Sequence, residues 1–154
     1  IGNRPVHWGD MPKKLGYLDL MHVASWQISF KRESIVNNNV YFDEHMGAGS
    51  GNGAEEEFRF LTDCRKNGLA IYYVPFVIAD VAQTKSTWFK GYNEEFFINR
   101  GNTTRYIMGY VPAVLYAAYY SIRKRHQFDS DISWFKAFRL IMKGIHENRL
   151  GKKK

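Results

Sequence analysis

Apolar and polar positions in the first half of the chain predict short β-strands. Residues 24–30 alternate apolar and polar side chains, which is typical of a half-buried strand. Residues 40–42 form a second short apolar run. Residues 69–74 are an almost uninterrupted apolar run closed by Pro75, which predicts a buried strand. We therefore expect a sheet in this half of the chain.

The same pattern predicts helices around and after these strands. One helix should begin near residue 54, where acidic residues suit the first turn, and end at Asn67-Gly68. Residues 93–99 predict a short helix ended by Gly101. Residues 103–126 predict a longer helix, which Pro112 should kink.

A last amphipathic helix is expected up to about residue 148, with Ser130 as its N-cap. Its apolar stripe should consist of Phe135, Phe138, Met142 and Ile145. The acidic motif Asp129-Ser130-Asp131 is interpreted as part of this cap and not as a metal site. The predicted fold class is thus α/β: a mixed sheet with flanking helices over residues 1–101, then a helical extension over residues 102–154.

Composition places the chain among folded globular proteins. It has 154 residues, of which 45% are hydrophobic, 24% charged and 16% aromatic. The single cysteine, Cys64, excludes an internal disulfide, and without a secretory signal a cytoplasmic setting is expected. The N-terminal Ile1 suggests that the chain begins inside a larger protein.

The positive charge is concentrated at the C-terminal end. Residues 121–154 contain ten Lys or Arg against three acidic residues, which accounts for the whole net charge of +7. Aromatic residues beside these cations favour an anionic membrane surface as partner. The alternative is that the helices pack on the core and show a solvated basic face. Nucleic acid is the less favoured partner, because no recognised nucleic-acid-binding module accompanies the charge.

An ordered set of motifs runs through the middle of the chain. Each motif alone is short, so the order and spacing of the set are what is specific. The motifs are Phe42-Asp43-Glu44, the glycine-rich residues 47–53, Glu55-Glu56, Phe60-Leu61, Gly68 and the run 71–75 that ends in proline. Between about Ala24 and Gly101 the chain resembles the second half of the catalytic domain of family 2 glycosyltransferases.

This resemblance implies a GT-A fold, a nucleotide-sugar donor and inversion at the anomeric carbon. It also implies a divalent metal, Mg²⁺ or Mn²⁺, held mostly by an N-terminal donor-nucleotide half that these residues do not include. The acceptor would be a saccharide or lipid-linked saccharide. The expected role is cell-surface polysaccharide assembly, by a protein in the cytoplasm or bound peripherally to the inner face of the plasma membrane.

An inverting transfer needs a base that takes the proton from the acceptor hydroxyl. Three acids, Glu55, Glu56 and Glu57, follow the glycine-rich segment. Because successive helix residues diverge by about 100°, they cannot all serve one site. The resemblance assigns the base to Glu56, with Glu55 as an orienting neighbour. The alternative is an acidic first turn that only stabilises its helix.

Further candidates surround this pair. Acceptor binding is expected from Trp26, Asp43, Glu44, Gly49 and Gly51, although a core tryptophan, a turn-capping acid pair and glycines that only shape a loop are the structural alternatives. Lys85 and Ser86 are candidates for the donor phosphates, and Asp80 for the metal in place of the histidine that relatives carry. A solvated loop is the alternative there. A non-enzymatic module that docks on a membrane or partner is the alternative function.

Overall fold

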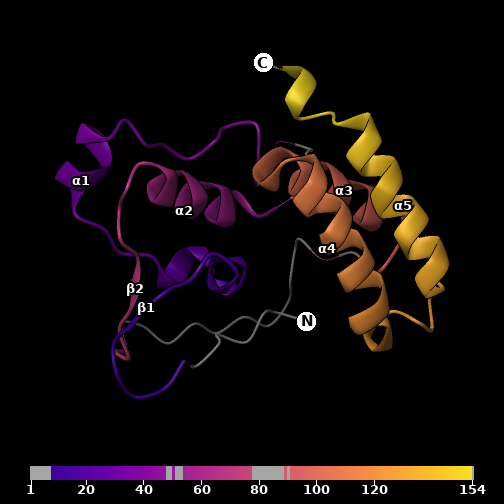
Figure 1. Cartoon of the computed structure of the whole chain (residues 1–154), viewed down its shortest axis with the longest axis horizontal. Helices are drawn as coiled ribbons and strands as arrows, with labels where there is room; N and C mark the ends of the chain where they lie inside the picture. Colours follow the sequence, from indigo (N-terminus) through magenta and orange to yellow (C-terminus); the bar gives the residue numbers. More distant parts are fainter. Residues whose placement is uncertain (1–7, 48–49, 51–53, 78–88, 90, 154) are drawn as a thin grey trace. The chain divides into compact units, whose positions relative to one another are not determined.

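The structure is a computed structural model of the chain, and it describes residues 8–47, 50, 54–77, 89 and 91–153 (Figure 1). The chain divides into two compact units. Unit 1 consists of Ile1–Glu44 and Glu55–Thr87, and unit 2 of His45–Ala54 and Trp88–Lys154. The described residues are mostly helical, with one small antiparallel sheet.

Unit 1 contains short elements around one longer helix. In chain order they are β1 (Lys13–Lys14), the 3₁₀ turns η1 (Asp19–His22) and η2 (Ser25–Gln27), α1 (Arg32–Asn37), α2 (Glu56–Lys66) and β2 (Tyr72–Tyr73). The two strands pair antiparallel, with Lys13 opposite Tyr73. This ladder is the only sheet in the described part of the chain.

Helix α2 confirms the helix predicted after residue 54. Glu56 and Glu57 occupy its first turn, while Arg65 and Lys66 occupy its last, so both ends suit the helix dipole. The helix ends at Asn67, and Gly68 follows in a left-handed conformation (φ 79°) that glycine adopts without strain. Its buried residues are Phe58, Phe60, Leu61, Thr62 and Cys64.

The strands predicted before α2 are wrong. Within residues 24–30 the chain forms the turn η2, because the Gln27 side chain folds back and accepts a hydrogen bond from the Ala24 amide at 2.9 Å. Residues 40–42 form no strand either. Their apolar side chains are used for packing on α2 and not for a ladder: the Phe42 ring stacks on Phe60 with centroids 4.2 Å apart.

The strand predicted over residues 69–74 is confirmed only as the two residues of β2, and it is not buried, since Tyr72 is exposed. A run of apolar residues fixes a preference for extended backbone, but a strand needs a neighbouring strand to accept its hydrogen bonds. Here β1 offers only two residues.

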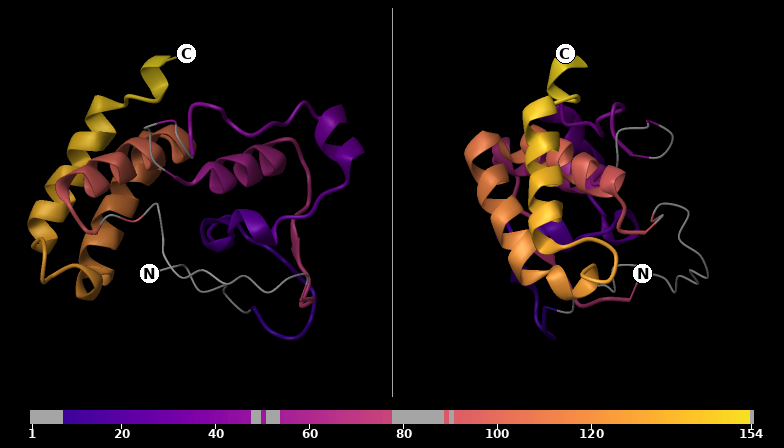
Figure 2. Two further views of the ribbon diagram at one scale, coloured as in Figure 1. Left: turned by 180° about the vertical axis from the view of Figure 1, so that it is seen from behind. Right: turned by 90° about the vertical axis from the view of Figure 1, so that its right-hand side faces the viewer.

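Unit 2 is a three-helix arrangement of α3 (Glu94–Met108), α4 (Tyr110–Arg123) and α5 (Trp134–Glu147), with short 3₁₀ turns η3 (Arg125–Gln127) and η4 (Gly151–Lys153). The three helices lie side by side, each in contact with the other two (Figure 2). The expected domain boundary at residue 101 falls inside α3, which runs unbroken from residue 94 to 108. The two compact units therefore divide the chain elsewhere. The division into domains at residue 101 stays a prediction.

Two predicted helix breaks are wrong. Gly101 lies inside α3, and the break comes at Gly109, whose left-handed φ of 87° turns the chain into α4. Pro112 does not kink a helix. It lies in the first turn of α4, where its missing N–H would have had no partner inside the helix.

Gly101 is inside a helix because α3 and α5 cross there in backbone contact. A Cβ atom on Gly101 would lie 2.1 Å from the Ile141 carbonyl oxygen, and one on Gly144 would lie 2.0 Å from the Ile98 carbonyl oxygen. Neither separation is sterically possible. Only glycine at both positions lets the two helices approach this closely.

Helix α5 is confirmed, but its start and its buried face differ from prediction. The N-cap is Ser133, which accepts a hydrogen bond from the Lys136 amide, and not Ser130. The buried positions are Ala137, Ile141, Gly144 and Ile145. Of the predicted stripe, Ile145 is buried, Phe138 and Met142 pack at the edge of the core, and Phe135 is exposed. The buried face of α5 differs from the predicted stripe because the small residues Ala137 and Gly144 allow the neighbouring helices to pack closely against it.

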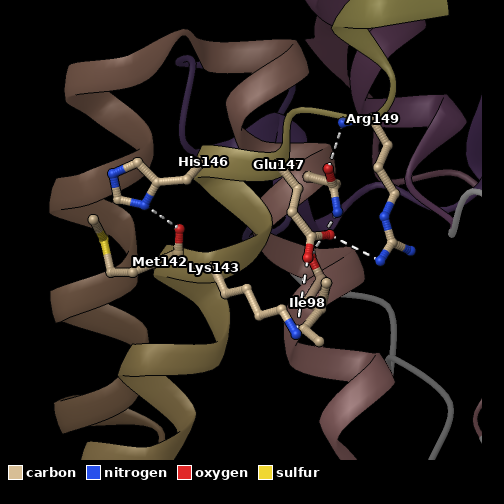
Figure 3. A network of polar contacts seen from close by, with 7 residues as sticks. Ile98, Met142, Lys143, His146, Glu147 and Arg149 are labelled. Atoms are coloured by element: carbon tan, nitrogen blue, oxygen red, sulfur yellow. Dashed lines mark hydrogen bonds and ion pairs between the residues drawn. The ribbon is translucent and has the colours of Figure 1, made fainter.

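The segment after α5 is fixed to α3 by Asn102. Its buried side chain accepts a hydrogen bond from the Arg149 amide at 2.7 Å and donates one to the Ile98 carbonyl at 3.2 Å. Glu147 adds ion pairs to Arg149 at 2.8 Å and to Lys143 at 3.9 Å (Figure 3). These contacts hold the C-terminal end of α5 in place.

Candidate functional site

Glu56 is the first residue of α2 and its carboxyl is partly buried. One of its oxygens, Oε2, is removed from solvent and has no hydrogen-bond partner among the residues that the structure describes. Burial raises the pKa of Glu56 above its ordinary value, and the negative charges of Glu57 and Glu55 raise it further, against the opposing effect of nearby backbone N–H groups. This carboxylate is therefore more basic than an exposed glutamate.

Glu55 precedes the helix in a left-handed conformation, with φ 82° and ψ 24°. A residue with a Cβ pays about 1 kcal/mol for this conformation. No side-chain cap hydrogen bond forms at this position. Strain of this kind persists only where the surroundings impose it, and it is concentrated at functional sites.

A hollow of about 350 Å³ lies beside α2. It is open and mostly polar, and its lining residues are Asn39, Val40, Tyr41, Asp43, Arg59, Asp63 and Asn67. Inside it, the Arg59 Nε atom pairs with an Asp63 oxygen at 2.7 Å. The hollow thus offers both hydrogen-bond donors and acceptors.

The helical wall of the hollow is on the same face of α2 as Glu56. Arg59, Asp63 and Asn67 follow one another at intervals of four residues, and Glu56 precedes Arg59 by three. Residues at these spacings share one face of a helix. Three residues of helix rise about 4.5 Å, so Glu56 lies about one turn before Arg59, the first α2 residue that lines the hollow.

The other wall is the segment after α1, which Phe42 and Val40 fasten to unit 1. The Phe42 ring stacks on Phe60, and Val40 is buried with its amide donating to the Ile35 carbonyl at 3.1 Å. Tyr41 and Asp43 line the hollow together with Val40. Tyr41 is largely exposed, so its ring is open to a ligand.

The acceptor-binding candidates from the sequence separate in the structure. Asp43 lines the hollow. Trp26 lies exposed on η2 and Glu44 is exposed, and neither lines it. The remaining candidates lie outside the described residues: Gly49, Gly51, Asp80, Lys85 and Ser86.

Sequence reasoning missed Tyr41, Arg59 and Asp63. The signal for the last two was present, because a polar residue every fourth position along α2 marks a second, non-core face of that helix. Tyr41 carried no such signal, since residues 40–42 were interpreted as a strand.

The described residues contain no group of three or more His, Cys, Asp or Glu side chains that could hold a metal ion. The one expected ligand, Asp80, is not among them. The described side chains therefore do not by themselves fit the expected metal, and no chemical step is derived through one. In the same part of the chain, no helix has the length and apolar character needed to cross a bilayer.

Comparison of the chain with protein-family models, with curated proteins and with solved structures finds no match.

Proposed function

We propose that unit 1 carries the acceptor side and the catalytic base of an inverting, nucleotide-sugar-dependent glycosyltransferase of family 2. The observation that carries the proposal is Glu56: a partly buried carboxyl with raised pKa, one oxygen of which has no hydrogen-bond partner among the described residues, on the α2 face that lines a polar hollow with Arg59 and Asp63. The motif order between Ala24 and Gly101 supports it. A complete GT-A fold and a donor-nucleotide half belong to the same proposal.

In the proposed reaction, Glu56 removes the proton from an acceptor hydroxyl while that oxygen attacks the anomeric carbon of the donor sugar. The new carbon–oxygen bond forms as the bond to the diphosphate breaks, and the diphosphate leaves with its electron pair. The proton stays on Glu56. A raised pKa favours this step, since it makes the carboxylate a better proton acceptor near neutral pH. A divalent Mg²⁺ or Mn²⁺, held by the donor-nucleotide half, belongs to the same proposal.

The hollow is proposed to hold the acceptor saccharide. A sugar presents hydroxyl groups around its ring and weakly apolar C–H faces. Asp43 and the Arg59–Asp63 pair would bind hydroxyls, and the exposed Tyr41 ring would contact a sugar face. Glu56, one helical turn away, would then meet the reacting hydroxyl.

The test is Glu56→Gln in the full-length product of the gene that encodes these residues. Release of nucleoside diphosphate is measured over a panel of uridine-, guanosine- and thymidine-diphosphate sugars, with a membrane extract as acceptor source. Loss of a general base should lower the rate by about 10²–10⁴-fold. Binding of the nucleotide sugar should remain, because Glu56 acts on the acceptor.

Glu57→Gln is the matched control, since Glu57 is the neighbouring acid in the same turn and points about 100° away. It should keep its activity within a few-fold. A folded Glu56→Gln protein that transfers sugar as fast as the Glu57→Gln protein would refute the assignment of the base.

A further inference from the structure

Helix α4 carries an exposed apolar stripe. Along it lie Val111, Leu115, Tyr119 and Ile122, which are 66%, 67%, 53% and 55% exposed. Their spacing of four, four and three residues puts them on one face of the helix. The opposite face packs on unit 2 through Ala113, Ala117 and Tyr120, which are buried. The stripe is therefore an outward face that the described residues leave uncovered.

Charge along α4 and the residues that directly flank it has one sign. Between Arg105 and Arg123 there is no charged residue, and Lys124 and Arg125 follow directly. Residues 105–128 contain no Asp or Glu. Within the described residues, Arg123, Lys124 and Arg125 form no ion pair. Apolar side chains are thus bordered at both ends of α4 by cations, three of them unpaired at its C-terminal end.

We propose that this face of α4 docks on an anionic phospholipid surface. Fourteen residues make a helix of about 21 Å, too short to cross a hydrocarbon core of about 30 Å, so α4 would lie in the plane of the interface. Aliphatic side chains would enter the acyl boundary, Tyr119 would sit at headgroup level, and Arg123, Lys124 and Arg125 would contact lipid phosphates.

Two features favour a bilayer over a protein partner. The stripe lies along the convex surface of a single helix, with its four side chains exposed in one row. Three of the cations are adjacent at the C-terminal end of α4 and are not interleaved with acids, whereas helix-pairing surfaces usually alternate the two charges. An anionic surface satisfies all three cations without requiring a particular register.

The experiment measures binding of the 154-residue chain to vesicles by co-sedimentation. Vesicles of phosphatidylglycerol mixed with phosphatidylcholine are compared with vesicles of phosphatidylcholine alone. We expect binding to the anionic vesicles only, and weaker binding as salt is raised. Equal binding to both kinds of vesicle, or to neither, would overturn the proposal.

Two variants locate the contact. Leu115→Ser should weaken binding about tenfold or more by removing a side chain that enters the membrane. Leu18→Ser is its control, because Leu18 is 68% exposed and lies in unit 1, outside the stripe. The two substitutions should change the thermal unfolding of the chain little, since both side chains are exposed.

The combined replacement of Arg123, Lys124 and Arg125 by Gln should weaken binding about 100-fold, at roughly fivefold for each cation. Its control replaces the exposed residues Lys14, Lys31 and Arg32, which removes the same charge from unit 1. If both triple variants weaken binding equally, net charge and not this face binds the lipid, and the proposal fails.

A second copy of the chain is the other occupant to exclude. Sedimentation velocity without lipid should show a monomer; a dimer that Leu115→Ser dissociates would assign the stripe to self-association and overturn the lipid proposal. None of these outcomes depends on Glu56. Vesicle binding can therefore fail while sugar transfer holds, and the reverse.

Discussion

Glu56 is the residue at which function and stability should oppose each other. Burial and neighbouring acids raise its pKa in the folded chain. Folding therefore favours the protonated form, and the folded state is penalised once the pH exceeds the folded pKa. A carboxyl group at such an unfavourable position is expected of a site selected for proton transfer and not for stability.

The prediction is that Glu56→Gln raises stability at neutral pH. The stabilising contribution of the protonated group is complete below the ordinary glutamate pKa and is lost as the pH rises through the raised one. The free energy of unfolding of the variant should therefore be higher than that of the parent chain at pH 7. The difference should be less than about 1 kcal/mol, because water still reaches the side chain. The difference should vanish toward pH 4.

Urea unfolding of both proteins between about pH 4 and 7 measures this difference directly. Subtracting one curve from the other removes the contribution of groups such as Asp19, whose pKa is lowered chiefly by the Gly16 amide and which loses stabilisation in acid. A variant less stable than the parent at pH 7 would show that Glu56 is a structural carboxylate.

At the scale of elements, the α3–α5 crossing dominates the packing of unit 2. Gly144→Ala would put a methyl group against the Ile98 carbonyl, so the helices must separate. We predict a loss of about 2–4 kcal/mol in the free energy of unfolding, measured by urea denaturation followed by helical circular dichroism. Gly101→Ala should behave alike.

Gly16→Ala is the comparison, since its Cβ would make an ordinary contact of 3.5 Å with the Asp19 carboxylate. Gly16→Ala should change the free energy of unfolding little. A Gly144→Ala chain as stable as the Gly16→Ala chain would mean that α3 and α5 are not in backbone contact.

Elements whose ends carry their own signals could be predicted from the sequence. Helix α2 has acids at its start and Asn67-Gly68 at its end, and both determine its length locally. The continuity of α3 through Gly101 could not be predicted, because a glycine stops an isolated helix but permits a close crossing once α5 is present. The strands predicted over residues 24–30 and 40–42 are wrong, and the one over residues 69–74 is shorter than predicted, because extended segments need partner strands that a local pattern does not supply.

The candidate site was predictable in part. Glu56 and Asp43 stand out through the motifs around them, and the structure puts Asp43 on the wall of a polar hollow beside the α2 face that begins with Glu56. The partial burial of Glu56 is not encoded by any local sequence pattern. The contribution of Tyr41 depends on the docking of Phe42 onto Phe60.

At the scale of the whole molecule, unit 2 has an apolar core of its own. That core joins all three long helices and the turn before α5; its buried members are Phe97, Ala113, Ala117, Tyr120, Phe128, Ile132, Ala137, Ile141 and Ile145. Arg100 extends it, with its guanidinium over the rings of Phe96 and Tyr120 and a hydrogen bond to the Tyr116 hydroxyl at 2.6 Å.

We predict that residues 91–154 fold when expressed alone, because every buried member of this core lies within them. The fragment should show a cooperative thermal transition and the helical content of α3, α4 and α5 by circular dichroism. A fragment without a cooperative transition would mean that unit 2 needs unit 1 or residues 45–54 to fold.

The contact between α3 and α5 at Gly101 and Gly144 also limits how homologous sequences can diverge. Where backbone meets backbone, no exchange of one side chain can be offset by a change in the facing one, so neither Gly101 nor Gly144 has a gradual mutational route to a larger residue. Descendants of this helix pair should keep both glycines, 43 positions apart, after surrounding positions have diverged. Two glycines at this spacing, each inside a predicted helix, could therefore identify distant homologues of the chain that overall sequence similarity does not reveal.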